Sequence, residues 1–309
     1  MKTKDFFDKW LTKYVYNTVK LRTYNKYNLN LVNYIYPFLG EIQIENITKE
    51  TIIDFIDKLI NNPEKKLSTN TIIGIIQTLN QGFNFALELK YISLNPIKGI
   101  KLPKIKEKEV IAINRKEQRK IEEYCLNHKK SNYIGIVLCL YTGIRIGELL
   151  ALTWKDIDFK QHLVYIKRTS YYAKKDNKYK VMIDTPKTIK STRIIPLNKN
   201  LSSLLYSRYK MSKSEFVITT KDNKMVDVRS YQRTFQSVLS KCKIEKYNFH
   251  SLRHTFATRA IELGVDVKTI SDILGHSTVN ITLNRYAHSL LEHKKSEMDK
   301  LSRLLCCVK

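Results

Sequence analysis

Apolar residues recur every three or four positions through the N-terminal third of the chain, and this spacing predicts helices. Gly40 ends one apolar segment, while Thr48 and Ser68 each precede another and are predicted N-caps. The apolar positions at helical spacing are Phe6, Phe7, Trp10, Leu11, Tyr14, Tyr27, Leu31, Tyr34, Ile35, Phe38, Ile52, Phe55, Ile56, Leu59, Ile72, Ile75, Ile76, Leu79 and Phe83. Four helices with these apolar faces predict a small bundle.

The middle of the chain alternates apolar and polar residues, which is the pattern of half-buried strands. Residues 162–168, 178–183 and 192–197 predict three antiparallel strands, and 215–219 predicts a further short one. The second half of the chain is therefore expected to contain one small sheet.

Helical patterns surround these strands. Asn114 begins a string that resembles a capping box, and an apolar helix is predicted from Ser131 to Gly143. Further helices follow the strands and are interrupted at Gly264 and Gly275. The predicted fold class is mainly α with a small antiparallel sheet.

The best candidate for a domain boundary is a lysine-rich segment in which Pro96, Gly99 and Pro103 interrupt any helix. This composition suits a basic linker along a DNA backbone as well as an ordinary solvated linker. The predicted parts are a helical domain at 1–95, the linker at 96–109, and a second domain at 110–309.

Charge narrows the range of partners. Among the 309 residues, Lys and Arg outnumber Asp and Glu by 55 to 29, a formal net charge of +26, which favours a nucleic-acid partner. A generic basic protein, such as a ribosomal component, is the alternative at this point. The five cysteines form no CxxC pair, so a zinc site and disulfides are not expected. The N-terminus lacks the apolar region of a secretory signal, and the longest apolar run is too short to span a bilayer. A cytoplasmic protein with no membrane partner is expected.

Four short strings in the second half of the chain carry the candidate chemistry: TGIRIGELLALTW, TPKTIKSTRIIPL, HSLRHTFATRA and LGHSTVNITLNRYAH. Together they contain basic and phenolic groups that suit one task, the attack of a tyrosine on a phosphodiester whose charge is neutralised by cations. The candidate site residues are Arg145, Lys187, His250, Arg253, His276 and Tyr286.

These four strings, in this order, resemble the tyrosine recombinases, or phage integrase family, over about 114–295. The resemblance continues more weakly through the N-terminal helices, which are similar to that family's SAM-like core-binding domain. It implies a catalytic second domain in which Arg145 and Arg253 hold the scissile phosphate, while His276 donates to it and His250 assists proton transfer. It also implies that Tyr286 attacks phosphorus to give a 3′-phosphotyrosyl bond.

The resemblance makes Lys187 the general acid that protonates the departing 5′ oxygen, with Lys190 as a rival three residues later. His254 and His288 are expected to be structural, and His254 is expected to point elsewhere. Taken alone, Arg145 would be read as one half of a surface salt bridge with Glu148. No metal or nucleotide cofactor is expected, because the chain has neither a metal-ligand string nor a P-loop.

The expected function is a site-specific recombinase of a phage or integrative mobile element. The expected partners are double-stranded DNA at core sites, three further copies of the chain in a tetramer on two duplexes, and an accessory directionality factor. Its expected location is the bacterial nucleoid. A predicted tail helix, Ser289 to Leu305, would dock on a neighbouring protomer. Two alternatives remain: a type IB topoisomerase, and a non-catalytic DNA-binding protein on the same scaffold.

Overall fold

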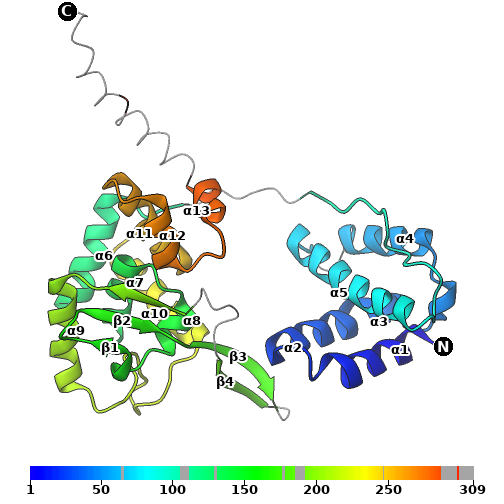
Figure 1. Cartoon of the computed structure of the whole chain (residues 1–309), viewed down its shortest axis with the longest axis horizontal. Helices are drawn as coiled ribbons and strands as arrows, with labels where there is room; N and C mark the ends of the chain where they lie inside the picture. Colours follow the sequence, from blue (N-terminus) through cyan, green and yellow to red (C-terminus); the bar gives the residue numbers. More distant parts are fainter. Residues whose placement is uncertain are drawn as a thin grey trace, which may run out of the picture. The chain divides into compact units, whose positions relative to one another are not determined.

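The structure is a computed structural model that describes residues 1–63, 66–104, 111–128, 131–175, 178–184, 192–245, 247–286 and 298. The chain separates into two compact units, one built on Met1–Lys108 and the other on most of Glu109–Lys309 (Figure 1). The predicted domain limits at residues 95 and 110 stay predictions, although Ile97, from the expected linker, is buried in the core of the first unit.

The first unit consists of four helical segments, as the apolar spacing predicted. They are α1 (Thr3–Lys9) with the π-helical turn Trp10–Val15, α2 (Leu21–Asn30) running through a second π turn into α3 (Tyr36–Leu39), α4 (Lys49–Ile60), and α5 (Thr69–Glu88). The predicted caps are present, because Thr48 Oγ1 accepts from the Thr51 N–H and Ser68 Oγ from the Thr71 N–H.

Close packing between α1 and α5 depends on Gly82. A Cβ atom at this position would lie 2.0 Å from the ring of Phe7, which is itself fully buried. The buried Asn30 joins α2 to α5 through hydrogen bonds to the Gly74 carbonyl and to the Thr78 hydroxyl. A polar group inside the bundle is thus fully engaged, which fixes the register of the two helices.

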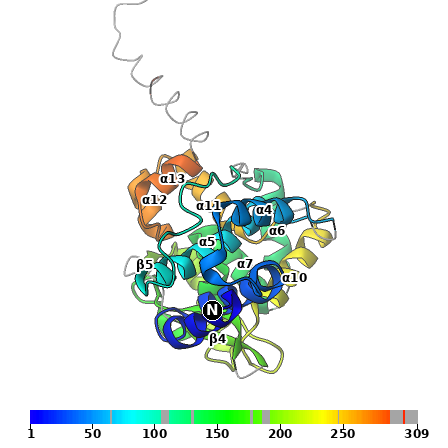
Figure 2. The same cartoon turned by 90° about the vertical axis from the view of Figure 1, so that its right-hand side faces the viewer.

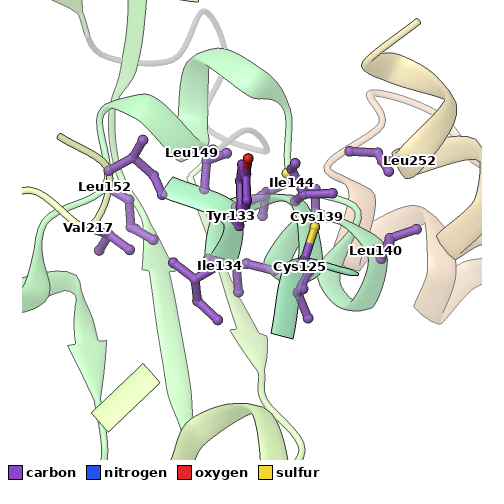
Figure 3. Close-up of a cluster of buried hydrophobic side chains, with 14 of the residues drawn as sticks. Cys125, Tyr133, Ile134, Cys139, Leu140, Ile144, Leu149, Leu152, Val217 and Leu252 are labelled. Atoms are coloured by element: carbon purple, nitrogen blue, oxygen red, sulfur yellow. The ribbon is translucent and has the colours of Figure 1, made fainter. Parts of the chain in front are cut away.

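The second unit is built around the apolar helix α7 (Ile134–Thr142), which is buried at every position except Tyr141. It packs against α6 (Arg115–Asn127), α8 (Ile146–Leu150) and α11 (His250–Glu262), and Figure 3 shows its side chains at the centre of the core. One half of the predicted capping box of α6 is present, since Asn114 Oδ1 accepts from the Glu117 N–H. The apolar helix ends at Gly143, as predicted, and Gly143 adopts the left-handed conformation with φ +63°.

The strands form two small groups, whereas one sheet was expected from the sequence. β1 (Ile157–Asp158), β2 (Leu163–Ile166) and β5 (Arg193–Pro196) make an antiparallel sheet in the order β1-β2-β5, while β3 (Thr169–Lys175) pairs with β4 (Lys178–Asp184). The expected strand at 215–219 is reduced to isolated bridges at Phe216 and Thr219.

The remaining helices are α9 (Lys199–Met211), α10 (Val228–Lys241), α12 (Val267–Leu274) and α13 (Val279–Arg285). α12 contacts α11, α13 and β5, and Figure 2 shows α12 beside α13. Of the predicted site residues, Arg145, Arg253 and His276 lie at the C-terminal end of α12.

Candidate active site at the C-terminal end of α12

Arg145 is placed by the turn that joins α7 to α8. Gly143 must be glycine there, because its φ is positive and a Cβ would lie 2.6 Å from side-chain atoms of Leu274 and Phe256. Arg145 then caps α8, and its own backbone N–H donates to Glu148 Oε2 at 2.9 Å. The guanidinium pairs with Glu148 at 2.8 Å and donates to the Gly275 carbonyl at 3.0 Å. The salt bridge considered from the sequence exists, and the same side chain also reaches α12.

A second arginine, Arg193 of β5, holds the other side of Glu148. Its Nη1 and Nη2 donate to the two carboxylate oxygens at 3.1 and 2.8 Å. Burial alone would raise the pKa of Glu148, but the hydrogen bond and charge of Arg193, with the charge of Arg145, lower the pKa below its usual value. Glu148 is 4% exposed and is therefore a buried carboxylate shared by two guanidinium groups.

Arg253, on α11, is the most deeply buried of the three arginines, with 2% of its surface exposed. It donates to the Gly143 carbonyl at 2.8 Å and to the Leu274 carbonyl at 2.7 Å. Burial, followed by the positive charge of Arg145, lowers the pKa of Arg253 to about 9, so the group remains a cation at pH 7.

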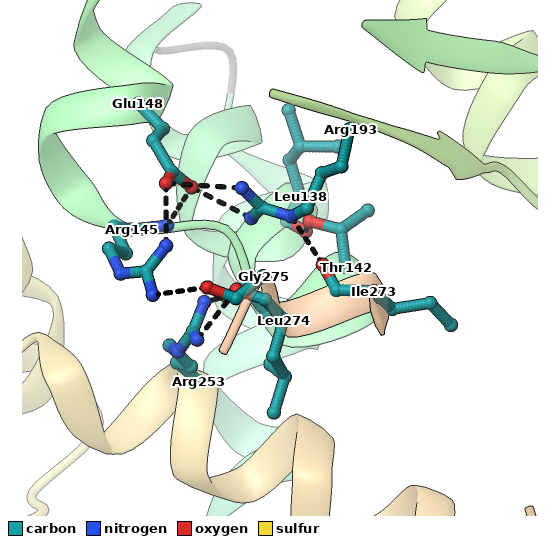
Figure 4. Close-up of polar contacts among 10 residues, drawn as sticks. Leu138, Thr142, Arg145, Glu148, Arg193, Arg253, Ile273, Leu274 and Gly275 are labelled. Atoms are coloured by element: carbon teal, nitrogen blue, oxygen red, sulfur yellow. Dashed lines mark hydrogen bonds and ion pairs between the residues drawn. The ribbon is translucent and has the colours of Figure 1, made fainter. Parts of the chain in front are cut away.

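Three consecutive carbonyl groups at the end of α12 each accept from a different arginine (Figure 4). Arg193 Nε donates to Ile273 O, Arg253 to Leu274 O, and Arg145 to Gly275 O. The last carbonyls of a helix have no partner within it and carry its negative dipole end, so cations bind there favourably. We call Arg145, Glu148, Arg193 and Arg253 the arginine cluster.

The glycine of the LGH string is required by the same packing. Gly275 ends α12 with φ +65°, and a Cβ at this position would lie 3.0 Å from Cδ of Arg193. The next residue, His276, is buried and its Nδ1 lies 2.8 Å from the hydroxyl of Thr282 on α13. The LGH string thus connects the arginine cluster to the last described helix.

Tyr286 follows α13 and is 3% exposed. Its ring joins an apolar group formed by Ala257, Ala260, Ile261, Ile270 and Leu274. The phenolic oxygen lies 2.8 Å from Nδ1 of His254. We call His254, Tyr286 and these five apolar side chains the nucleophile pocket.

The contact of His254 with Tyr286 corrects the expectation that His254 points elsewhere. His254 comes directly after Arg253, about 100° further around the helix, so the motif gave no sign that it would face the tyrosine. His250, one turn earlier, is exposed, and its ring centroid lies 4.5 Å from that of His254 at 88°.

Sequence reasoning also missed two members of the arginine cluster. Glu148 was considered only as a surface partner of Arg145, and Arg193 was part of a quoted string without a role. The signal for Glu148 was its spacing, because a residue three positions after a helix cap can reach back to the cap. For Arg193, a charged residue at a buried position of an alternating strand was the available sign.

Several predicted residues lie outside the part of the chain that the structure describes. They are Lys187, Lys190, His288 and all of the predicted tail helix except Met298. Within the described ranges, no group of His, Cys, Asp or Glu side chains has the arrangement of a metal site. A search of the same ranges finds no helix with the length and hydrophobicity needed to span a bilayer.

Residues 105–293 match the family model described as the phage integrase family, and residues 3–60 match its N-terminal SAM-like domain. The chain belongs to the phage integrase family. It is a tyrosine recombinase, and the family recognised from the four strings is confirmed, as is the predicted fold class.

Two relatives and two solved structures illustrate the similarity. A "Tyrosine recombinase XerC-like" protein of Caldanaerobacter subterraneus subsp. tengcongensis is 30% identical over 97% of this chain and 82% of its own. The "ICEBs1 integrase" of Bacillus subtilis is 27% identical over 91% of this chain and 77% of its own.

The Tn1549 transposon integrase, solved in complex with a circular intermediate DNA, superposes with a TM-score of 0.79 at 22% identity, covering 97% of this chain and 99% of that one. The lambda integrase tetramer bound to a Holliday junction gives a TM-score of 0.68 at 18% identity, covering 91% and 77%. At these identities the two structures show that the fold is shared.

Proposed function

We propose that this tyrosine recombinase is the integrase of a phage or integrative mobile element, and that it cuts and rejoins duplex DNA through a bond to Tyr286. One observation carries the proposal: Arg145, Arg253 and His276 converge on the C-terminal end of α12, and Tyr286 follows one short helix later. Cations and a phenol on adjoining elements are what a metal-free attack on a phosphodiester requires.

In the proposed reaction Tyr286 Oη attacks the scissile phosphorus. The Oη–P bond forms while the bond from phosphorus to the 5′ oxygen breaks, which leaves a 3′-phosphotyrosyl bond and a 5′ hydroxyl. Arg145 and Arg253 stabilise the charge on the non-bridging oxygens, and His276 donates to one of them. By family resemblance Lys187 supplies the proton for the 5′ oxygen. Rejoining reverses these steps, so the energy of the phosphodiester is conserved and no ATP is consumed.

The relatives support a mobile-element role, because an ICEBs1 integrase and a Tn1549 transposon integrase share the sequence pattern or the fold over almost the whole chain. The net charge of +26 supports double-stranded DNA as the partner. We further propose a tetramer on two duplexes, by analogy with lambda integrase, and a separate directionality factor. The XerC-like protein and the ICEBs1 integrase are bacterial, and this supports a bacterial cytoplasm as the proposed location.

The proposal is tested by trapping the covalent intermediate. Overlapping nicked duplexes that tile the DNA on both sides of the gene, together with the junction formed if that region circularises, are incubated with the full chain. We expect one duplex to give an adduct that resists denaturation, in EDTA and without nucleotide. Binding to that duplex should weaken steeply as salt rises, because phosphate contacts release counterions.

The two alternative functions predict different outcomes of the same experiment. Relaxation of supercoiled DNA without preference for any duplex would identify a type IB topoisomerase. Tight binding with no adduct on any duplex would identify a non-catalytic DNA-binding protein. A requirement for a divalent metal in the cleavage step would contradict the proposed charge stabilisation by arginine.

A further inference from the structure

The contact between Tyr286 and His254 has no place in the roles assigned so far. The phenolic oxygen lies 2.8 Å from Nδ1 of His254, within normal hydrogen-bond range, and the two rings lie 5.9 Å apart at 63°. The oxygen belongs to a side chain that is 3% exposed and packed among aliphatic groups. A hydroxyl buried in such surroundings requires a polar partner, and His254 provides one.

As an imidazole, His254 can do more than form a hydrogen bond with the phenol. Neutral imidazole is the side chain best suited to take a proton near neutral pH, and it must lie within hydrogen-bond reach of the group that loses the proton. His254 satisfies the distance in the DNA-free protein. His250, to which the family resemblance gives proton transfer, contacts His254 ring to ring at 4.5 Å.

We propose that His254 is a further catalytic residue, whose Nδ1 accepts the phenolic hydrogen bond and takes the proton as Tyr286 attacks DNA. The proposal rests on the proposed function, because it assigns a base to the same nucleophile. It requires the tautomer of His254 that carries its proton on Nε2, so that Nδ1 accepts.

The proton and electron balance is complete with groups already named. The Oη–H bond of Tyr286 breaks and the proton moves to His254, which becomes an imidazolium. The Oη–P bond forms, and the electron pair of the broken P–O bond stays on the 5′ oxygen, which the general acid protonates. On rejoining, His254 returns its proton to the phenolate as the tyrosine leaves.

Position also favours His254 over a purely structural role. It directly follows Arg253, and the negative charge of an ionised Tyr286 would raise the pKa of that guanidinium. The same attraction favours the negative charge that develops on Oη, while the imidazole removes the proton. Consecutive residues of α11 would then act on the two partners of the reaction, the phosphate and the nucleophile.

The first test measures the rate of adduct formation on the nicked duplex that the wild-type protein traps. His254→Ala removes both hydrogen bond and base, whereas His254→Asn keeps a polar atom near the position of Nδ1 but cannot take the proton. We expect both variants to form the adduct roughly 10²- to 10⁴-fold more slowly, with DNA affinity changed by no more than a few fold. Added imidazole should restore part of the rate in His254→Ala and none in His254→Asn.

His128→Ala is the matched control. His128 is an exposed histidine of the same unit that also binds through Nδ1, to the Tyr124 carbonyl, and stacks on an aromatic ring. It should cleave like the wild type. Wild-type rates in His254→Ala would overturn the proposal, and so would a wild-type rate in His254→Asn, because a hydrogen bond without a base would then suffice.

A second measurement is made without DNA, on protein carrying ¹³C in its tyrosine rings. Tyr286→Phe identifies the Tyr286 signal, which His254→Ala and His254→Asn should shift and His128→Ala should not. An unchanged signal in His254→Ala would show that the contact is absent in solution and would overturn the proposal. If the wild-type protein traps no duplex at all, the proposed function fails and the base role fails with it. An adduct that forms equally well without His254 removes the base role alone.

Discussion

The arginine cluster and the nucleophile pocket lie on adjoining elements but are held in different ways. In the arginine cluster, Glu148 and three consecutive backbone carbonyls fix guanidinium groups from a loop, a strand and a helix. In the nucleophile pocket, apolar side chains surround the ring of Tyr286, and its hydroxyl lies 2.8 Å from Nδ1 of His254. Tyr286 directly follows α13, a helix of seven residues.

This difference corresponds to two requirements of the reaction. Charge stabilisation works best when the cations are already in place, since no reorganisation is then needed at the transition state. Tyr286, the proposed nucleophile, is only 3% exposed, so the groups around it must open before a phosphate can reach its oxygen. The helix before it is short, and a short helix has little stability of its own and depends on packing. The proposed site therefore combines a preorganised electrostatic part with a tyrosine that is enclosed in the DNA-free protein.

The largest expected effect is that of removing the hydroxyl of Tyr286, which lies in the nucleophile pocket. Tyr286→Phe should abolish the covalent adduct while DNA affinity stays within a few fold, because only one oxygen is lost. Folding stability should fall by no more than about 0.5–1.5 kcal/mol, the net value of one hydrogen bond. Adduct trapping, a binding titration and chemical denaturation measure the three quantities.

Two other tyrosines test whether the assignment of the nucleophile is correct. Tyr247→Phe should cleave normally, since its hydroxyl is bound to Glu117. Tyr231 is fully buried in the core and its hydroxyl donates to the Asn132 carbonyl. An adduct formed by Tyr286→Phe, with loss in Tyr247→Phe, would transfer the nucleophile to Tyr247.

The next effect concerns Lys187, the proposed general acid, which belongs neither to the arginine cluster nor to the nucleophile pocket. Lys187→Ala should slow cleavage of the ordinary phosphodiester by roughly 10²- to 10⁴-fold. A 5′-bridging phosphorothiolate has a leaving group that needs no proton, so on that substrate Lys187→Ala should be nearly normal. Lys190→Ala should resemble wild type on both substrates, and the opposite pattern would make Lys190 the acid.

Arg145 tests how far the arginine cluster acts in catalysis rather than in folding. Its side chain is 37% exposed, so Arg145→Lys should fold normally and bind DNA. Lysine keeps the charge but lacks the planar fork, and we expect cleavage to fall by about 10²- to 10³-fold. Arg115→Lys, at a more exposed arginine of the same unit, is the control. A large loss of stability in Arg145→Lys would mean that the cluster holds the fold through this residue too.

Substitution of Glu148, unlike that of Arg145, should affect mainly the stability of the fold. Glu148→Gln leaves Arg193 buried without its counter-charge, and the free energy of unfolding should drop by about 3–5 kcal/mol. Glu262→Gln breaks two more exposed ion pairs, with Arg115 and Arg259, and should cost about 0–1 kcal/mol. Denaturant titrations measure the free energy of unfolding of both variants. If Glu148→Gln and Glu262→Gln lowered it equally, the buried ion pairs of the arginine cluster would matter no more for stability than ion pairs at the surface.

The same carboxylate predicts the smallest effect, a dependence of stability on pH. The folded-state pKa of Glu148 lies below its usual value, so its contribution is fully present above the unfolded pKa of about 4.3 and is lost as the pH falls through the folded pKa. Stability should therefore decrease in acid, and the decrease should be smaller in Glu148→Gln. Identical pH profiles would show that other carboxylates are responsible.

Local features of the fold followed well from the sequence. The caps Thr48, Ser68 and Asn114 and the left-handed glycines Gly143 and Gly275 depend on residues within one turn, so their patterns are visible in the sequence. The apolar helix α7 was predictable because almost all of its residues are apolar, and only Tyr141 is exposed.

Contacts between residues far apart in the chain could not be predicted from the sequence. The partners of Arg193 are a carboxylate 45 residues earlier and a carbonyl 80 residues later, and no local pattern encodes such contacts. His254 meets Tyr286 because α13 returns to α11, which depends on the packing of Gly275 and Thr282. The roles assigned to Lys187 and to the tail rest on family resemblance alone.

The burial of Tyr286 has a consequence for chromosomal DNA that the protein binds at the wrong sequence. A chain with a net charge of +26 spends much of its time on DNA of the wrong sequence, since phosphate contacts do not discriminate. Each accidental attack there would leave a broken strand joined to protein, which is a lesion for the host. If Tyr286 is the nucleophile, its burial keeps a phosphate away from the phenol until the pocket opens, so that sliding along the genome and cutting it are separate events.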